Sequence, residues 1–535
     1  MNEAPGPHDG VRAQEEHIMF SIDAGWALTV AVFMPAVSAV LLVMMPSSKD
    51  AAIKWTAVGM TGISFLWVAL LTFSFDFNAA GSLQFETIVP WIDAIDARYH
   101  IGLDGISVPL LFLTYLLPFL CAIYTTKHIP NPGKPKAFLA LMMLLQTGMA
   151  GTFIAMDLVL FFIFWEIVLV PMFFLIGMWG GPRREYASVK FFLYTLFGSV
   201  FMLIAFLAIY FQAIESGVAN PWDMVELAGA NIGTSSFQLW AFAGIFLGFA
   251  IKVPMWPFHT WLPDAHTEAP TIGSVLLAGV LLKMGTYGFI RIALPILPEG
   301  AAAFAPWIGV LAVIGIIYGS LCCLAQTQVK RLIAFSSVGH MGFVMLGIAS
   351  MNEQGIQAAL YGNIAHGVVT GLLFFLAGSM KERFHTYEIA DIGGGMLTKM
   401  PRYGVLLVYT SVASLGLPGL AGFWGEFTAM WSAISPGSAS GTFRADNELF
   451  YLFLVIGAAL GTVLTAGYFL WLIQRVVLGT PLPKWAGEKL DDIMAVEYVA
   501  WIPLAIIILV MGVFPQVIFG VQNDAVNNLV SFFTV

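Results

Sequence analysis

Six ionisable side chains lie inside long apolar stretches of the sequence. They are Glu166, Lys252, Lys283, His340, His366 and Glu426. A charged side chain at membrane depth costs about 3 kcal/mol or more, so it normally faces a protein interior or a wet cavity and pairs there with another group. The set has carboxylates at its two sequence ends, with lysines and histidines between them. Because opposite charges stabilise each other's ionised form, such a row can pass a proton by stepwise re-pairing.

Two of the six residues adjoin predicted breaks in membrane helices. Lys252 is followed at once by Pro254 and Pro257, and these prolines remove two backbone donors and interrupt the helix. Glu426 follows a second break, in SLGLPGLAGFWGEF, which contains Pro418 and several glycines. A broken helix at membrane depth is tolerated only where protein or water covers it. A buried charge beside such a break is therefore typical of an ion path and is hard to explain as plain anchoring.

The other four residues lie well inside apolar runs. Glu166 has about eight apolar residues on each side, which places it near mid-membrane at a rise of about 1.5 Å per residue. Lys283 lies near the middle of a span that we expect to be unbroken, and a buried lysine can exchange protons near neutral pH. His340 and His366 lie well inside predicted spans, and histidine suits proton relay. The plainer interpretation is a structural ion pair, or a histidine satisfied by a neighbouring carbonyl.

Three further features each leave two interpretations open. Asp157, at the edge of a span, is either a helix-start cap or part of a proton entrance. Lys190 either extends toward the membrane surface or assists Glu166. A cluster at the end of the seventh span is either a metal site of unusual spacing or, in the interpretation that we prefer, a hydrogen-bonded turn at the membrane interface. Its members are His259, Asp264, His266 and Glu268.

The composition indicates a polytopic membrane protein. Of the 535 residues, 59% are apolar and only 10% are charged, whereas about 25% of a soluble domain would be charged. The net charge of −9 argues against nucleic acid as a partner. The three cysteines, Cys121, Cys322 and Cys323, are too few for a four-thiolate cluster site. Since no P-loop or dinucleotide-binding fingerprint follows a predicted strand either, any redox or nucleotide chemistry must reside in another chain.

A window of about 20 residues picks out fourteen apolar spans. They run near 24–45, 55–74, 106–124, 137–156, 158–178, 189–211, 239–262, 273–295, 303–324, 332–349, 357–378, 403–433, 448–474 and 497–520. Seventeen Lys and Arg residues fall in the odd-numbered connections and only four in the even connections and the termini. By the positive-inside rule, both termini should lie outside the cytoplasm. The polar residues 1–23 lack the basic start of a signal peptide, and we expect an exposed tail.

These patterns predict an all-α polytopic membrane protein with about 14 transmembrane helices and two inverted five-helix repeats that contain broken helices. The broken spans are the seventh and the twelfth, and because they are an odd number of spans apart, the second unit would be inverted relative to the first. Two unrelated kinks are the alternative. The expected parts are an exposed tail (1–23), three first spans (24–124), a first repeat (137–295), a second, inverted repeat (303–475) and a C-terminal span (497–520).

The run FAIKVPMWPFHTWLPDAHTEAPT closely resembles the signature of the antiporter-like membrane subunits of proton-pumping NADH:quinone oxidoreductase, respiratory complex I. That family also includes Mrp-type sodium/proton antiporter chains. SSVGHMG, GNIAHGVVTGLLFF and GLPGLAGFWGEF extend the resemblance over most of spans four to thirteen. The chain resembles the M-type branch of this family, which has a glutamate where Glu426 lies, whereas the L-type and N-type siblings have a lysine at this place. The N-terminal tail is longer than the family leads us to expect.

The resemblance implies that Glu166 and Lys252 form a coupling pair, that Lys283 and His340 form a central relay, and that Glu426 is nearest the exit. It implies proton translocation driven by quinone reduction in partner subunits. FMN, iron–sulfur clusters and quinone are then expected in those partners, with no cofactor and no catalytic redox centre in this chain. The expected partners are other complex I membrane subunits, including two sibling antiporter-like chains, and membrane lipids.

The expected location is a bacterial inner membrane rather than a mitochondrial one. The main functional alternative is an Mrp-type sodium/proton antiporter subunit. A purely structural membrane scaffold is a third possibility, but anchoring needs no buried charges, and each of them is costly.

Overall fold

The computed structural model describes residues 25–435 and 448–533, so the predicted tail at residues 1–23 lies outside the described residues. Within the described ranges, thirteen helices are long and apolar enough to cross a membrane. The twelfth predicted span is divided into two shorter helices, α19 (Pro401–Ser414) and α20 (Ala421–Ile434). The prediction of an all-α polytopic membrane protein with about 14 spans is therefore confirmed.

The membrane helices of the first half form from apolar runs that end at turns rich in proline, glycine and polar residues. In chain order they are α1 (Trp26–Met44), α2 (Asp50–Ser74), α3 (Ser107–Thr125), α4 (Pro135–Ile154), α5 (Leu158–Ile167), α6 (Leu169–Trp179), α7 (Arg184–Glu215) and α9 (Ser235–Lys252). The helices α5 and α6 form one span, with only Val168 between them. A short helix, α8 (Met224–Leu227), lies in the loop before α9.

The eighth span is a composite of α-helical and π-helical turns. It contains α11 (Thr271–Leu276), the π-helical turn η3 (Leu277–Leu281), α12 (Leu282–Gly288), the π-helical turn η4 (Phe289–Ala293) and α13 (Leu294–Ile296). Lys283 was expected on an unbroken helix, and this expectation is wrong because π-helical turns flank its helix on both sides. Such turns are frequent at functional sites.

The second half of the bundle contains five further long helices. They are α14 (Pro298–Leu324), α15 (Val329–Ala349), α16 (Glu353–Phe384), α22 (Glu448–Leu472), which continues as the π-helical turn η5 (Ile473–Val477), and α24 (Ala495–Val513). Three helices of a single turn lie in its connections. These are α17 (Ile389–Ile392), α18 (Met396–Lys399) and α23 (Pro483–Ala486).

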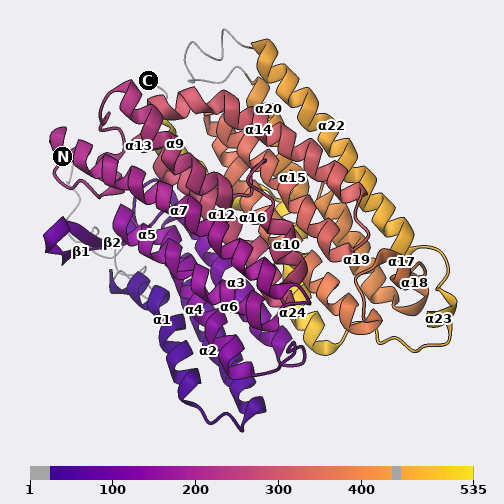
Figure 1. Ribbon diagram of the computed structural model, residues 1–535. Helices are drawn as coiled ribbons and strands as arrows, with labels where there is room; N and C mark the ends of the chain where they lie inside the picture. The colour runs from indigo at the N-terminus through magenta and orange to yellow at the C-terminus, as the bar shows by residue number, and fades with distance from the viewer. Residues whose placement is uncertain (1–24, 436–447, 534–535) are drawn as a thin grey trace, which may run out of the picture.

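An antiparallel hairpin follows α2 and was not part of the predicted all-α fold. Its strands, β1 (Gln84–Ile92) and β2 (Ala97–Leu103), are rich in β-branched and aromatic residues, which favour extended structure. The backbone N–H of Met156 donates to the carbonyl of His100 at 2.9 Å, so β2 lies beside the start of α5. We call this end of the bundle the hairpin end (Figure 1).

The last predicted span ends earlier than expected. The helix α24 stops at Val513 rather than near residue 520, because Phe514 leaves the helical conformation and is followed by Pro515. A further helix, α25 (Gln516–Val530), then packs against α16. It reaches the hairpin end, where Asn528 donates to the carbonyl of Gly81 at 3.0 Å.

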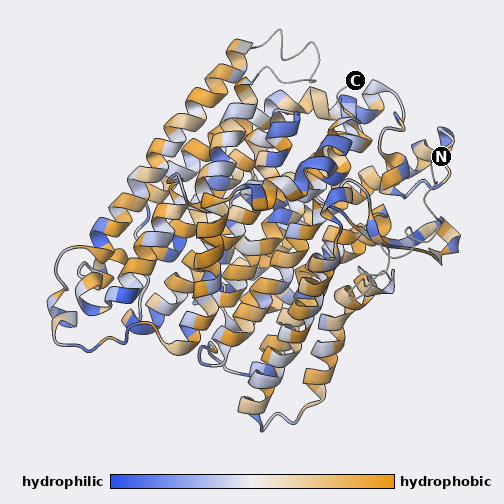
Figure 2. Ribbon diagram, turned by 180° about the vertical axis from the view of Figure 1, so that it is seen from behind, coloured by the Kyte–Doolittle hydropathy of each residue, from blue (hydrophilic) through white to orange (hydrophobic). Residues whose placement is uncertain are grey.

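Three neighbouring spans are enclosed by the rest of the chain. The buried share of the most apolar window is 100% for α15 and 94% for both α16 and the composite eighth span, but only 28% for the span built on α22. In Figure 1, α12 and α16 lie in the middle of the bundle, with α1 and α2 along one side and α22 along the opposite side. Figure 2 shows mostly apolar residues along these peripheral helices. The enclosed spans carry Lys283, His340 and His366, so the fold keeps these side chains away from lipid.

Candidate functional site

Lys283 and His366 form a hydrogen-bonded pair at the centre of the bundle. The ammonium nitrogen of Lys283 lies 2.6 Å from Nδ1 of His366, and both residues are buried. Because Nδ1 accepts from the ammonium group, the ring proton of a neutral His366 must be on Nε2. That nitrogen has no hydrogen-bond partner within the described residues. The imidazole is therefore placed to pass a proton onward from its free edge.

The π-helical turn before Lys283 supplies a second acceptor for its ammonium group. Nζ of Lys283 also donates to the carbonyl oxygen of Ala278, within η3. A π-helical turn leaves backbone carbonyls without their ordinary helical partner, and these can then bond a side chain. Thr286, one turn further on, donates to Asn363 Oδ1 at 3.0 Å, which adds a second link between this span and α16.

His340 and Glu426 form a second pair, between α15 and α20. Nδ1 of His340 lies 2.7 Å from Oε1 of Glu426, and Nε2 of the same ring lies 3.0 Å from Oγ of Ser414. When Glu426 is ionised, Nδ1–H donates to the carboxylate and Nε2 accepts from the hydroxyl group. Both ring nitrogens are then occupied. Ser414 is the last residue of α19, so the break between α19 and α20 places groups on both sides of it around one imidazole.

The two pairs meet at a small internal cavity. The ring centroids of His340 and His366 are 5.8 Å apart. A cavity of about 30 Å³ is lined by both rings, Ser414 and Glu426. This volume is enough for about one or two water molecules, which need polar partners. The free Nε2 of His366 and the unpartnered Oε2 of Glu426 are such partners. Lys283, His366, His340 and Glu426 therefore form one continuous polar line.

Glu166 and Lys252 lie near each other in the first half of the bundle. Their charges interact, but no ion pair within 4.0 Å joins them among the described residues. Nζ of Lys252 lies 4.9 Å from the centroid of the Trp165 ring and has no hydrogen-bond partner in the described part of the chain. Trp165 in turn donates to Ser199 at 3.0 Å. Trp165 therefore holds the lysine by a cation–π contact.

The Glu166–Lys252 pair and the polar line that begins at Lys283 are joined by close backbone packing rather than by a hydrogen bond. Among the described residues, no hydrogen bond or ion pair links Lys252 to Lys283. A Cβ placed on Gly285 would lie 2.9 Å from the carbonyl oxygen of Phe249 and 3.0 Å from the nitrogen of Val253. Since only glycine permits this approach, α12 lies directly against the end of α9. Lys252 and Lys283 can therefore affect each other through space.

At the hairpin end, His100 lies between two carboxylates. Its Nδ1 is 2.7 Å from Asp223 and its Nε2 is 2.9 Å from Glu86. Burial alone would lower the pKa of His100, but the hydrogen bonds and charges of Asp223 and Glu86 outweigh burial and raise this pKa above its ordinary value. A protonated His100 therefore ties the hairpin to the loop that contains α8.

Asp157 is a helix cap, which is one of the two interpretations left open by the sequence. Its Oδ1 accepts from the backbone N–H groups of Val159 and Leu160 at 2.8 and 3.0 Å, at the start of α5. Its Oδ2 accepts from the N–H of Arg98 at 3.1 Å. Burial raises the pKa of Asp157 to about 6, although these backbone hydrogen bonds oppose the shift.

The cluster after α9 is divided among separate partners. Asp264, on α10 (Trp261–Glu268), pairs with Lys190 at 2.8 Å, so Lys190 neither extends to the surface nor contacts Glu166. Glu268 accepts from the backbone N–H of Arg183 at 3.0 Å. His266 stacks on a phenylalanine ring, and His259 packs against a tyrosine ring. Within the described residues, no group of three or more His, Cys, Asp or Glu residues is arranged to hold a metal ion.

Sequence reasoning missed two contributors to the site and the burial of one further lysine. Ser414 and Trp165 carry no charge, so nothing in the sequence distinguishes them from other serines and tryptophans of the spans. Lys330 was counted among the basic residues of a connection, yet it is the second residue of α15 and only 1% exposed. Its Nζ donates to the carbonyl of Ala269. Its position just before an apolar run was the one available signal.

The chain is similar to known proteins in both sequence and fold. Residues 155–443 match the family model described as NADH:quinone oxidoreductase/Mrp antiporter, TM. The chain is 39% identical to NADH-quinone oxidoreductase subunit M of Rhodobacter capsulatus, over 94% of this chain and 96% of the relative. A chain of respiratory complex I from Thermus thermophilus superposes with a TM-score of 0.81 at 30% identity, covering 95% of this chain and 99% of that chain. A chain of the Mrp complex from a Dietzia species shares the fold, with a TM-score of 0.77 at 20% identity, covering 93% of this chain and 52% of that chain.

Proposed function

Because the chain belongs to the NADH:quinone oxidoreductase/Mrp antiporter membrane family, and within it to the subunits M of NADH-quinone oxidoreductases, we propose that it translocates protons as one membrane subunit of such a complex. The observation that carries the proposal is the polar line of Lys283, His366 and His340 inside the three most enclosed spans, which ends at Glu426 on α20. Anchoring needs no such line, since each buried ionisable group is costly.

The proposed path begins with the coupling pair. Loss or gain of a proton at Glu166 changes the field at Lys252, because the two charges interact. A change at Lys252 then alters the balance at Lys283, which lies on the helix packed against the end of α9. Charges in a low-dielectric interior influence each other over several ångströms, so a hydrogen bond is not required at this step.

The second part of the path is a relay by hydrogen bonds. Lys283 passes a proton to Nδ1 of His366, and the proton on Nε2 of that ring leaves toward the cavity shared with His340. His340 takes up a proton at Nε2, which is otherwise held by Ser414, and its Nδ1 proton moves to Glu426. Each transfer occurs between groups within hydrogen-bond reach or about one water molecule apart, as proton transfer requires.

The energy for this movement must come from outside the chain. Moving one charge against 100 mV costs about 2.3 kcal/mol. We propose that quinone reduction in partner subunits supplies it, that FMN, iron–sulfur clusters and quinone reside in those partners, and that this chain has no redox centre. Two sibling antiporter-like chains and membrane lipids are the proposed neighbours. The proposed location is a bacterial inner membrane, with both termini on the periplasmic side and the helices of residues 137–295 and 303–475 acting as two inverted units.

The test measures NADH-driven quinone reduction and proton uptake together, in membranes that contain the complex with Glu166→Gln or Lys252→Met at normal protein levels. We expect both activities to fall while assembly is retained. Glu185→Gln, the same change on an exposed carboxylate of α7, is the matched control. Normal proton uptake in both Glu166→Gln and Lys252→Met would falsify the proposed path.

The Mrp-type antiporter is the second candidate, since such a chain shares the fold. In that case NADH oxidation would be untouched by Glu166→Gln, and growth in high sodium or at alkaline pH would fail instead. The identity of 39% to a subunit M, compared with 20% to the Mrp chain, favours the oxidoreductase.

A further inference from the structure

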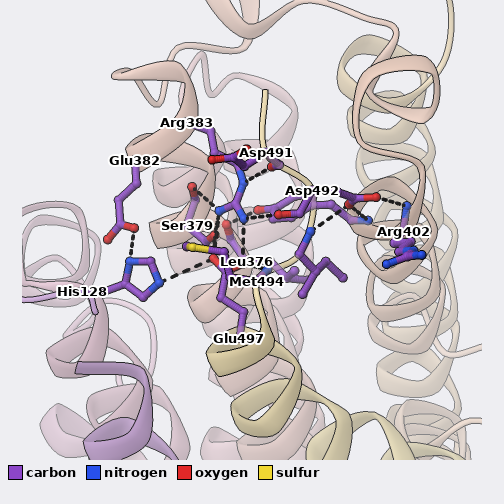
Figure 3. A network of polar contacts seen from close by, with 12 residues as sticks. His128, Leu376, Ser379, Glu382, Arg383, Arg402, Asp491, Asp492, Met494 and Glu497 are labelled. Carbon is purple, nitrogen blue, oxygen red and sulfur yellow. Dashed lines mark hydrogen bonds and ion pairs between the residues drawn. The ribbon is translucent and has the colours of Figure 1, made fainter. Parts of the chain in front are cut away.

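A buried polar node lies at the end of the bundle opposite to the hairpin end (Figure 3). Its centre is a bidentate ion pair between Arg383, in the last turn of α16, and Glu497, in the first turn of α24. The nitrogens NH1 and NH2 of Arg383 lie 2.8 and 2.6 Å from the two carboxylate oxygens of Glu497. The Glu497 side chain is fully buried and that of Arg383 is 6% exposed. None of these groups belongs to the row described above.

All the donors of Arg383 are engaged. Besides the carboxylate, Nε donates to the carbonyl of Asp491 at 2.8 Å and NH2 donates to the carbonyl of Asp492 at 2.7 Å. NH1 also donates to Ser379, one turn earlier on α16. The guanidinium group therefore fixes three segments at once, namely the end of α16, the start of α24 and the backbone between Asp491 and Asp492. A lysine in this place could not reproduce this planar set of contacts.

Asp492 extends the node to α19. Its carboxylate accepts from the backbone N–H groups of Arg402 and Tyr403 at 3.1 and 2.9 Å, which are among the free N–H groups at the start of that helix. The hydroxyl group of Tyr403 donates to the carbonyl of Leu376 on α16. The start of α19 is thus held against the end of α16 both through Asp492 and directly.

His128 adds a peripheral contact from the loop between α3 and α4. Its Nδ1 pairs with Glu382, and its Nε2 lies 3.7 Å from Glu497. The Tyr124 ring stacks on the imidazole, with centroids 4.3 Å apart. The charged and titratable groups around Glu497 are therefore Arg383, His128, Tyr124 and Tyr403.

Each of the two helices held by the node, α16 and α19, also carries a residue of the proposed proton path or a contact of it. His366 lies on α16, 17 residues before Arg383 (383 − 366), or about 26 Å along the helix. Ser414 is the last residue of α19 and bonds His340. Because a helix is stiff along its axis, the node at one end sets how far α16 and α19 are shifted relative to each other at the other end. That shift decides whether His366, His340 and Ser414 surround the same cavity.

We propose that Arg383, Glu497 and Asp492 act as a clamp that fixes the axial position of α19 relative to α16, and that Arg383 is thereby a positioning residue for the His366–His340–Glu426 part of the row. The inference rests on the proposed function, since positioning matters only where protons pass. It assigns to the last membrane helix, α24, the task of closing this clamp.

The test uses membranes containing the assembled complex with Arg383→Lys or Asp492→Asn, and it measures proton uptake per electron and its pH profile for each assembled complex. Arg383→Lys keeps the charge but loses the planar contacts. Asp492→Asn replaces one of the two oxygens that accept from the N–H groups of α19 with an NH2 group, which is a donor. We expect proton uptake per electron to fall by about tenfold, within the 10²-fold that a shift of about 1 Å far from the chemistry can cause. We also expect the pH profile to shift, because the His340 environment changes. A residue needed only for folding would lower the amount of complex and leave this profile unchanged.

Two reference variants separate the possible failures. Lys484→Gln removes an exposed ion pair with Asp391, 3.2 Å long, in the same half of the chain, and should behave as the unmodified complex. Glu426→Gln should lower proton uptake by about tenfold or more. If Glu426→Gln pumps normally, the proposed function fails. If Glu426→Gln loses proton uptake but Arg383→Lys and Asp492→Asn both keep the proton uptake per electron and the pH profile of the unmodified complex, the clamp is overturned. If only Asp492→Asn behaves as the unmodified complex, the link to α19 is overturned.

Discussion

Nδ1 of His340 lies 2.7 Å from a carboxylate oxygen of Glu426, across the contact between α15 and α20. The two residues are 86 positions apart in the chain, and the break between α19 and α20 helps to place both of them. Glu426 is near the start of α20, immediately after the break, while His340 is held on its other side by Ser414 at the end of α19. In the proposed path this pair is the last element of the polar line, so its protonation decides whether a proton can leave.

Replacing Glu426 by Gln tests this last step. The amide keeps an oxygen that can accept from His340 but cannot take up a proton. We expect NADH-driven proton uptake to fall by about tenfold or more, since a proton-transfer group commonly contributes about 10²-fold or more. Proton uptake and quinone reduction are measured on the same membranes. Glu299→Gln, the same substitution at an exposed site in the first turn of α14, should have no effect.

Replacing Lys283 by Met should affect both stability and function. The side chain keeps its length, but the carbonyl of Ala278 and Nδ1 of His366 lose their donor. An unsatisfied buried polar group costs about 1–3 kcal/mol, so we expect a lower Tm for the purified complex. Proton uptake should be lost even at temperatures where the complex is intact. Unchanged values of both quantities would show that Lys283 does not bond these groups.

A close helix contact beside Glu426 predicts the effect of a single methyl group. A Cβ on Gly425 would lie 2.8 Å from Cα of Gly362 on α16, and backbone cannot move aside cheaply. We expect Gly425→Ala to push α20 from α16 and lower both assembly and proton uptake. Gly59→Ala is the matched control, because nothing lies within 4 Å of its added Cβ and alanine is favoured over glycine in a helix by about 1 kcal/mol. Thermal unfolding of the two variants should therefore change in opposite directions.

The pH dependence of the hairpin end follows from His100. Its pKa is raised in the folded protein, so its contribution to stability is fully present below the ordinary histidine value of about 6.5 and is lost as the pH rises through the raised pKa. We expect the amides of β2 and α8 to exchange hydrogen faster at alkaline pH than at pH 6, after correction for intrinsic rates. In His100→Gln this difference should disappear. Equal protection at both pH values in the unmodified chain would contradict the assignment.

The sequence predicted the positions of the ionisable groups better than their pairing. Charges in apolar runs and prolines beside Lys252 are local signals, and they identified the spans, both helix breaks and the six residues of the row. The contact between Lys283 and His366 joins positions 83 residues apart. Such a pairing depends on how helices pack, and a single sequence carries no direct signal for it.

Two local features were missed for different physical reasons. The π-helical turns around Lys283 differ from an α-helix by one residue per turn, and no proline or charged residue marks them. The hairpin at Gln84–Leu103 is short and follows a long membrane helix, so its strand pattern is outweighed by the surrounding apolar runs. The inverted relation of the two five-helix units stays a prediction.

The end of α9 explains how an ammonium group without a hydrogen-bond partner is tolerated in the interior. Lys252 is the last residue of that helix, where the helix macrodipole places about half a negative charge. The break therefore also has an electrostatic effect, since it places the negative end of the helix macrodipole at the lysine. A helix that continued past Lys252 would move the negative end of the macrodipole away from the lysine and weaken that compensation. The prolines after Lys252 thus act on its charge without touching it.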